Sequence, residues 1–330
     1  MLLQVILLIV GFALLYCGAE WLVKGSANLA KSLGVSSVVI GLTVVAFGTS
    51  APELVVSVVA SIQNKSMIAV GNVVGSNICN IALILGIASF LIPITANRSV
   101  VRRDIPLMLA ISALLFILSL DSYISRTEGV ELFTGVILYT AYNYYLSARD
   151  KRTAVRRGAT QTAGPLDTEL SEIGYIESRF MQIFLILLGI AGVVIGARVM
   201  IYAAVVLMRN LGVSEKFVGL TIVAFGTSLP ELATSVVAAL KKQMDISIGN
   251  LVGSNVFNIL SVIGMAAIIR PVSIPGGFIK SGLVVDYVVM ILVSFLPLVM
   301  MWKDNTVKRR DGFILLCCYF GYLSYLIHRG

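Results

Sequence analysis

Long apolar stretches recur along the whole chain and are separated by short polar segments. As helices of about 20 residues, such stretches can cross the ~30 Å hydrocarbon core of a bilayer. The pattern predicts ten membrane spans, with a break near Gly48–Pro52 in the second span and another near Gly75 in the third. The predicted spans cover residues 2–31, 36–62, 67–90, 103–120, 128–147, 179–210, 214–240, 245–268, 281–302 and 311–328.

The second half of the chain repeats the first at a constant offset of 178 residues (231 − 53 = 178). GLTVVAFGTSAPE at 41–53 matches GLTIVAFGTSLPE at 219–231, and GNVVGSNICN at 71–80 matches GNLVGSNVFN at 249–258. With five spans in each half, the second half must enter the membrane from the opposite side. The predicted fold is therefore an all-α polytopic membrane protein with ten transmembrane helices as two inverted five-helix repeats.

The domains follow from this pattern: an N-terminal repeat at 1–147, a cytoplasmic linker loop at 148–178, and a C-terminal repeat at 179–330. Composition agrees, since 58% of the residues are hydrophobic and 13% are charged, against about 25% charged in soluble proteins. The mean hydropathy is +0.95. The lipid bilayer is thus the expected surrounding of most of the chain.

The net charge of +8 does not indicate nucleic-acid binding, because the cationic residues gather in short loops between the apolar runs. Of these loop residues, 16 Lys and Arg lie in one set of alternate loops and 7 in the other. Positive charge favours the cytoplasmic side. We therefore expect a multi-pass protein of the cell (plasma) membrane with both termini outside and the 148–178 loop in the cytoplasm.

Each GTSxPE motif places a carboxylate directly after a proline inside an apolar run. Pro52 lacks an N–H group and clashes with the preceding turn, so the helix should break there and the carbonyls around Ala46–Gly48 should lose their helical partners. Such groups are tolerated at membrane depth only where they line protein or a cavity. Pro230 repeats the arrangement before Glu231.

Hydroxyl, carbonyl and carboxylate oxygens come from the motif residues Thr49, Ser50, Glu53, Ser76 and Asn80, which carry no sulfur or imidazole. Oxygen-only ligands favour calcium, sodium or magnesium over zinc, copper or iron, and calcium accepts a cage built wholly of protein more readily than magnesium does. An acid at the bilayer centre costs roughly 2.5–3.5 kcal/mol. Glu53 and Glu231 share their motifs with no Lys or Arg, so a bound cation is their natural partner.

Glu20 and Arg198 also lie within predicted spans. They occupy equivalent repeat positions (198 − 20 = 178). For both we favour a structural role or an ion pair over ion binding.

The paired motifs resemble the alpha-repeats of the cation/calcium exchanger family, whose best-known members are sodium/calcium exchangers. The resemblance covers both repeats and agrees with the prokaryotic-type layout along the whole chain. It implies ion sites at the membrane midplane, no other cofactor, alternating access in which the first and sixth spans slide against the remainder, and a functional monomer.

The resemblance also implies a ligand set. For Ca²⁺ it comprises the carboxylates of Glu53 and Glu231 with the backbone carbonyls of Thr49 and Thr227. For Na⁺ it comprises Ala46, Thr49, Ser50, Glu53 and Ser76 in one half, and Ala224, Thr227, Ser228, Glu231 and Ser254 in the other. Many family members carry an aspartate at the position of Asn80 or Asn258, which are both polar and neutral here, so this central site has only two formal negative charges.

The predicted function is a secondary active antiporter that exchanges Na⁺ for Ca²⁺, with ions bound between Glu53 and Glu231. A proton/calcium or other cation antiporter is the alternative, with these two glutamates as the groups that would titrate. A cation channel would need a continuous pore, usually built by symmetric subunits. The complete site inside one chain argues against this alternative. We do not expect an enzyme, because no span core offers a histidine to serve as a base or metal ligand. Stoichiometry, potassium dependence and physiological direction are left open.

Overall fold

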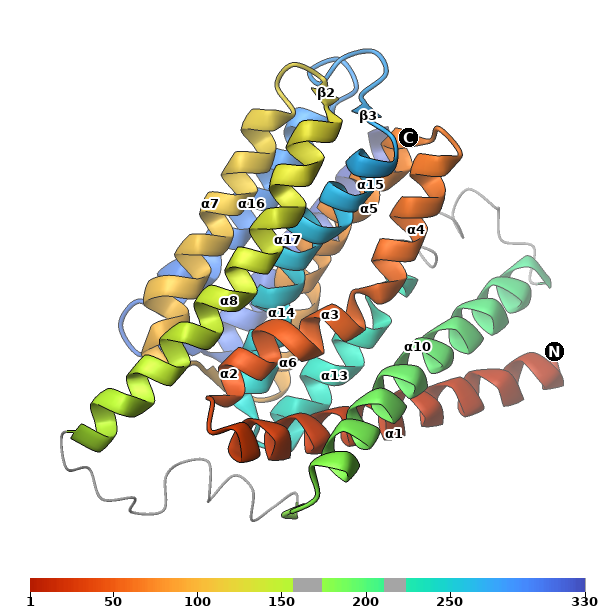
Figure 1. Ribbon diagram of the computed structural model, residues 1–330. Coiled ribbons are helices and arrows are strands. Elements are labelled where there is room, and N and C mark those ends of the chain that lie inside the picture. The colour runs from red at the N-terminus through yellow and green to blue at the C-terminus, as the bar shows by residue number, and fades with distance from the viewer. Residues whose placement is uncertain (157–173, 211–223, 330) are drawn as a thin grey trace.

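The computed structural model describes residues 1–156, 174–210 and 224–329, and helices dominate all three ranges (Figure 1). Six described helices are long and apolar enough to cross a membrane, and the bent pair Ser37–Thr49 and Ala51–Ile62 is a seventh candidate. The predicted spans at 103–120, 128–147 and 214–240 are mostly helical where described but are not among the six. The six are Leu2–Leu33, Ser66–Leu91, Arg179–Met208, Met244–Ile269, Leu283–Met300 and Arg309–Arg329.

The first half of the chain contains seven described α-helices besides the short α3, three π-helical segments and two short strands. The helix α8 extends beyond residue 147, the predicted end of the fifth span. The elements are α1 (Leu2–Leu33), α2 (Ser37–Ile40), η1 (Gly41–Val45), α3 (Ala46–Thr49), α4 (Ala51–Ile62), α5 (Ser66–Ile78), η2 (Cys79–Leu85), α6 (Gly86–Leu91), β1 (Ile94–Thr95), η3 (Val100–Asp104), α7 (Ile105–Leu118), β2 (Tyr123–Ile124) and α8 (Arg126–Arg156).

The second half follows the same order where it is described. Most of the predicted linker and the start of the predicted span at 214–240 lie outside the described residues. The elements are α10 (Arg179–Asn210), α12 (Ala224–Gly226), α13 (Leu229–Leu240), α14 (Met244–Phe257), η5 (Asn258–Ile263), α15 (Gly264–Ile269), β3 (Val272–Ser273), α16 (Leu283–Met300), β4 (Thr306–Val307) and α17 (Arg309–Arg329).

The predicted break near Gly48–Pro52 is confirmed. The helix α3 ends at Thr49, and α4 starts at Ala51 with a bend of 47° between the two runs. Pro52 lies in the first turn of α4, where its missing N–H would have no helical partner in any case. Pro230 occupies the same place in α13.

The predicted break near Gly75 is wrong. The helix α5 continues through Gly75 to Ile78, and the irregularity comes later, as the π-helical segment η2. A glycine lacks a side chain but keeps its N–H group, so it can continue a helix that neighbouring elements support. The equivalent π-helical segment η5 begins at Asn258. Such segments occur often at functional sites.

The runs α5–α6 and α14–α15 form the centre of the molecule. In the most apolar window of each run, 83% of the residues are buried, against 22% in α1 and 28% in α10. In Figure 1, α1 and α10 lie side by side along one flank, oblique to the upright bundle that contains α7, α8 and α16. The motif residues on α5 and α14 are therefore interior, whereas α1 and α10 are peripheral.

Two short antiparallel ladders join loops from opposite halves of the chain. Ile94 in β1 pairs with Val307 in β4, and Tyr123 in β2 pairs with Ser273 in β3. The loops at the two ends of α7 are thus tied to the loops at the two ends of α16. These ladders fix the relative height of the halves.

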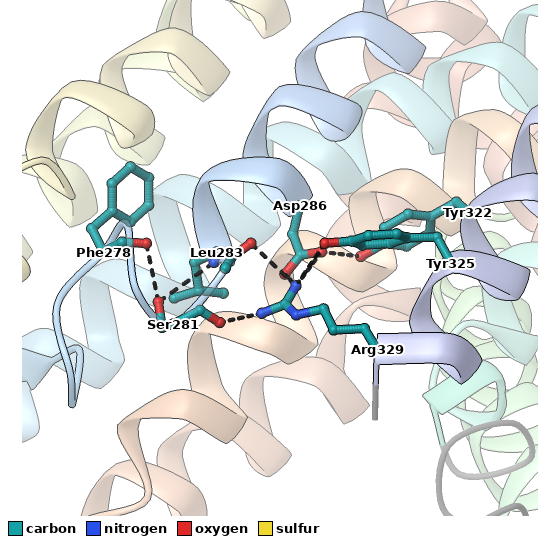
Figure 2. Close-up of polar contacts among 8 residues, drawn as sticks. Phe278, Ser281, Leu283, Asp286, Tyr322, Tyr325 and Arg329 are labelled. Carbon is teal, nitrogen blue, oxygen red and sulfur yellow. Dashed lines mark hydrogen bonds and ion pairs between the residues drawn. The ribbon is translucent and has the colours of Figure 1, made fainter.

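The end of α17 is attached to the start of α16 by an ion pair (Figure 2). The Arg329 guanidinium lies 3.2 Å from Asp286 Oδ2 and donates to the carbonyls of Gly282, at 3.1 Å, and Ser281. The Tyr322 hydroxyl donates to Asp286 Oδ1 at 3.1 Å. The Asp286 side chain is 11% exposed, so its charge depends on these partners.

Arg329→Gln should destabilise the protein, because it leaves a largely buried carboxylate without its cation. We expect a loss of roughly 1.5–3 kcal/mol, the range for hydrogen bonds to charged groups. The measurement is the thermal unfolding midpoint in detergent. Adding Asp286→Asn should restore part of the loss. Arg98→Gln is the control, since that exposed residue forms no ion pair within the described residues, and an equal loss in this variant would contradict the interpretation.

Candidate functional site: a buried oxygen cage

Glu53 and Glu231 are both fully buried, with 0% of each residue exposed. Each lies in the first turn of the helix that follows a break, α4 for Glu53 and α13 for Glu231. The N-terminus of a helix carries a partial positive charge that favours a carboxylate. The two breaks thus place two acids in the protein interior at positions where the backbone stabilises their charge.

The two motifs contact each other across the repeat. The Ser50 hydroxyl donates to Glu231 Oε1 at 3.0 Å. The Thr49 hydroxyl donates to Asn250 Oδ1 at 3.1 Å and lies 3.5 Å from the Ser254 hydroxyl. These hydroxyls of the first half therefore contact residues of the second half, and the breaks of the two halves face a shared site.

Seven oxygen atoms of the motifs are buried without a hydrogen-bond partner among the described residues. A buried oxygen without a partner normally carries a penalty of about 1–3 kcal/mol, and a charged one more. The concentration of such oxygens in these motifs fits the binding of Ca²⁺ or Na⁺, since both ions take oxygen ligands. They are Glu53 Oε1, Glu53 Oε2, Glu231 Oε2, Thr227 Oγ1, Ser228 Oγ, Asn80 Oδ1 and Asn258 Oδ1.

Two asparagines support the helices that carry the acids. Asn72 Nδ2 donates to the Glu53 carbonyl at 3.2 Å and to Ser57 Oγ at 2.9 Å. Asn250 Nδ2 makes the matching bonds in the other half, at 3.5 Å to the Glu231 carbonyl and 2.9 Å to a serine hydroxyl. Sequence reasoning assigned neither residue, although both repeat at the offset of 178. Their repetition at this offset is the sequence signal that could have identified them.

The remaining predicted residues are partly located. Ala46, Ser76 and Ser254 are buried on α3, α5 and α14. Thr227 lies between α12 and α13, and only the backbone of Ala224 is described, at the start of α12. The expectation that the Ala46 carbonyl loses its helical partner is wrong, since the Ser50 N–H donates to it at 3.0 Å.

Glu20 forms the ion pair that we expected in general terms, although not with Arg198. Its Oε1 lies 2.5 Å from the ammonium of Lys241. Lys241 follows α13 directly, so the pair connects α1 with the helix that carries Glu231. Arg198 is exposed on α10. Groups of three or more His, Cys, Asp or Glu that could hold a metal do not occur among the described residues.

A membrane-embedded helical chain with two matched buried acids has the features of an ion transporter, and comparison with known proteins agrees. The family model described as sodium/calcium exchanger protein matches residues 3–149 and again 181–328. The chain belongs to this family. It is therefore an integral multi-pass membrane protein and a transporter, not an enzyme, and its activity is cation/calcium exchange.

Relatives match over nearly their whole length. The chain is 37% identical to inner membrane protein YrbG of Escherichia coli (strain K12) over 96% of this chain and 94% of that protein. It is 34% identical to the sodium/calcium exchanger MaX1 of Methanosarcina acetivorans over 98% of each.

A solved structure of the sodium-calcium exchanger NCX_Mj, soaked with 2.5 mM Na⁺ and 0.1 mM Ca²⁺, superposes with a TM-score of 0.80. The two sequences are 29% identical, and the match covers 98% of each chain.

Ser50→Ala and Ser228→Ala form a matched pair that tests the crossed contacts. The hydroxyl of Ser50 contacts Glu231, whereas that of Ser228 has no partner among the described residues. If both belong to one cage, each variant should raise the Na⁺ concentration for half-maximal exchange, by roughly three- to tenfold for a lost hydrogen bond of ~1 kcal/mol. An effect in Ser50→Ala alone would exclude Ser228 as a ligand.

Proposed function

We propose that this protein is a sodium-driven calcium exchanger that binds its ions between Glu53 and Glu231. The observation that carries the proposal is the pair of fully buried acids whose carboxylates retain three oxygens without a hydrogen-bond partner among the described residues. Two carboxylates balance one Ca²⁺, and Na⁺ ions can neutralise the same charges in its place. Ca²⁺ and the Na⁺ ions that replace it therefore neutralise the same two carboxylates.

The oxygens divide into a calcium set and a sodium set. In this proposal Ca²⁺ binds the carboxylates of Glu53 and Glu231 and the backbone carbonyls of Thr49 and Thr227, and the two asparagine oxygens complete the central site. Sodium uses hydroxyl oxygens together with carbonyl and carboxylate oxygens, so the two sets overlap. The proposed sodium ligands are Ala46, Thr49, Ser50, Glu53, Ser76, Ala224, Thr227, Ser228, Glu231 and Ser254.

The topology that fits this function is ten spans in two inverted repeats, with both termini outside and the linker in the cytoplasm. The double match of the family model supports the two repeats. The ladders support the alternation, because this topology places β1 and β4 on the cytoplasmic side and β2 and β3 on the outer side. A complete site within one chain supports a functional monomer.

The helices α1 and α10 are the proposed moving part of an alternating-access cycle. Their packing supports motion as one unit, since Gly18 and Gly192 bring the two backbones into direct contact. A Cβ atom added to Gly18 would lie 2.6 Å from the Val193 nitrogen, so any larger residue would separate the helices. Small residues at such contacts are typical of tight helix pairs in membranes.

The pair contacts the ion site through two isoleucines of α10. Ile190 packs against Gly48 and Ile201 packs against Gly226, at distances that leave no room for a Cβ atom on either glycine. Each of these glycines immediately precedes the Thr-Ser of its motif. Sliding of α10 along its axis would therefore shift one isoleucine relative to each break, which is how the pair would open one side and close the other.

Glu53→Gln and Glu231→Gln should each abolish calcium transport while the protein still accumulates in the membrane, because one negative charge cannot balance Ca²⁺. The measurement is calcium uptake into sodium-loaded vesicles. Glu131→Gln, at an exposed acid of α8, is the matched control and should transport normally. Near-normal uptake in both site variants would rule out the proposal. Uptake driven equally well by a proton gradient without sodium would favour the proton/calcium alternative.

Two engineered disulfides test the moving pair. Gly25→Cys with Ile186→Cys links α1 to α10, and Gly48→Cys with Ile190→Cys links α10 to α3. In both pairs the glycine contacts the isoleucine side chain, within the reach of a disulfide. Because a Cβ atom at Gly25 would also lie 2.8 Å from the Gln182 carbonyl oxygen, each oxidised variant is compared with the same variant in the reduced state. In a background with the four native cysteines replaced, oxidation should leave exchange intact in the first variant and stop it in the second.

The control is the same protein after reduction, which should recover exchange in the second variant. Arrest by both disulfides would show that α1 and α10 move relative to each other. Arrest by neither would exclude α10 as a moving element.

A further inference from the structure

We propose that Asn77 and Asn255 are positioning residues that orient the carboxamides of Asn80 and Asn258, so that both carboxamides present oxygen to the ions. The inference rests on the proposed function. An asparagine side chain ends in an oxygen and an amino group of similar shape, and only the oxygen can bind a cation. Something must therefore select which end faces the site.

For Asn80 the selection starts at a backbone carbonyl, which can only accept a hydrogen bond. Asn255 Nδ2 donates to the Asn77 carbonyl at 3.3 Å, which fixes the amino end of Asn255 and leaves its oxygen at the other end. Asn80 Nδ2 donates to that oxygen at 3.0 Å. The amino end of Asn80 is thereby occupied, and its Oδ1 has no partner among the described residues.

The same sequence of bonds holds Asn258. Asn77 Nδ2 donates to the Asn255 carbonyl at 3.3 Å and also lies 3.8 Å from Met290 Sδ. Asn258 Nδ2 donates to Asn77 Oδ1 at 3.0 Å, and its own Oδ1 is again without a partner among the described residues. Each half of the chain therefore orients the carboxamide of the other half.

Burial makes the orientation strict. All four asparagines are buried, with at most 1% of any of them exposed, so water does not compete for the amino groups. Asn80 lies in η2, which packs against α13, and Asn258 lies in η5, which packs against α4. These are the helices that carry Glu231 and Glu53. A reversed carboxamide would present an amino group to a cation and weaken its binding.

The test is a crossover: an alanine substitution at each positioning residue is combined with an aspartate substitution at each oriented asparagine in turn. Asn77→Ala frees the amino end of Asn258, and Asn255→Ala frees that of Asn80. We expect each variant to raise the Ca²⁺ concentration for half-maximal uptake by about tenfold or more, as changes to residues that orient metal ligands do. Aspartate has oxygen at both ends and needs no orientation. Asn258→Asp should therefore restore calcium affinity in Asn77→Ala, and Asn80→Asp should restore it in Asn255→Ala.

The mismatched combinations are the controls. Asn80→Asp in Asn77→Ala, and Asn258→Asp in Asn255→Ala, add the same charge but leave the freed carboxamide unoriented, so they should recover little. Equal recovery in matched and mismatched variants, or recovery in none, would overturn the inference and leave the asparagines with a packing role. If an alanine variant does not accumulate, the same crossover is run with serine in its place.

Failure of the crossover is distinct from failure of the proposed function. If Glu53→Gln and Glu231→Gln abolish calcium uptake and the crossover shows no pattern, the exchanger assignment stands and only the positioning role falls. If the two glutamine variants transport normally, the ion site itself is elsewhere.

Discussion

The burial of two carboxylates in one protein interior is the constraint on which the rest of this structure depends. Isolated charges in a medium of low dielectric constant are too unfavourable to persist without compensation. The chain compensates in part, with helix N-termini at both acids and the Ser50 hydroxyl at Glu231. The remaining oxygens are those that the proposed function assigns to the transported ions. The helix breaks, the asparagine supports and the crossed hydroxyls can all be understood as ways to gather oxygens around this charge.

The parts of this arrangement that depend on local chemistry could be predicted from the sequence. Pro52 cannot continue a helix, so the break before Glu53 follows from one residue and its neighbours. The equivalence of Glu53 and Glu231 follows from the repeat. By contrast, Gly75 permits a break without requiring one, and the structure continues the helix through it and becomes π-helical from Cys79. The sequence does not indicate how far neighbouring helices support a glycine.

Contacts between the halves were also beyond prediction, because they depend on how the halves pack. The Ser50 contact with Glu231 and the exchange of bonds between Asn77 and Asn255 join residues far apart in the chain. Asn77 and Asn255 were visible only as parts of a repeated motif. A duplicated sequence in which each copy completes the other has a physical advantage, since the bonds that align the halves also shape the site between them.

The lengths of α1 and α10 tie this protein to its membrane. Each has 32 residues and is therefore about 48 Å long, well beyond the ~30 Å of a hydrocarbon core. Most residues in the apolar windows of both helices are not buried by protein, so lipid surrounds them in the membrane. The tilt of the helices determines how much of their length lies in the hydrocarbon core. If they are the moving part, each state of the cycle has its own mismatch with the bilayer. Membrane thickness then affects the free-energy difference between the outward and inward states. Lipid composition, which sets that thickness, would therefore change the exchange rate.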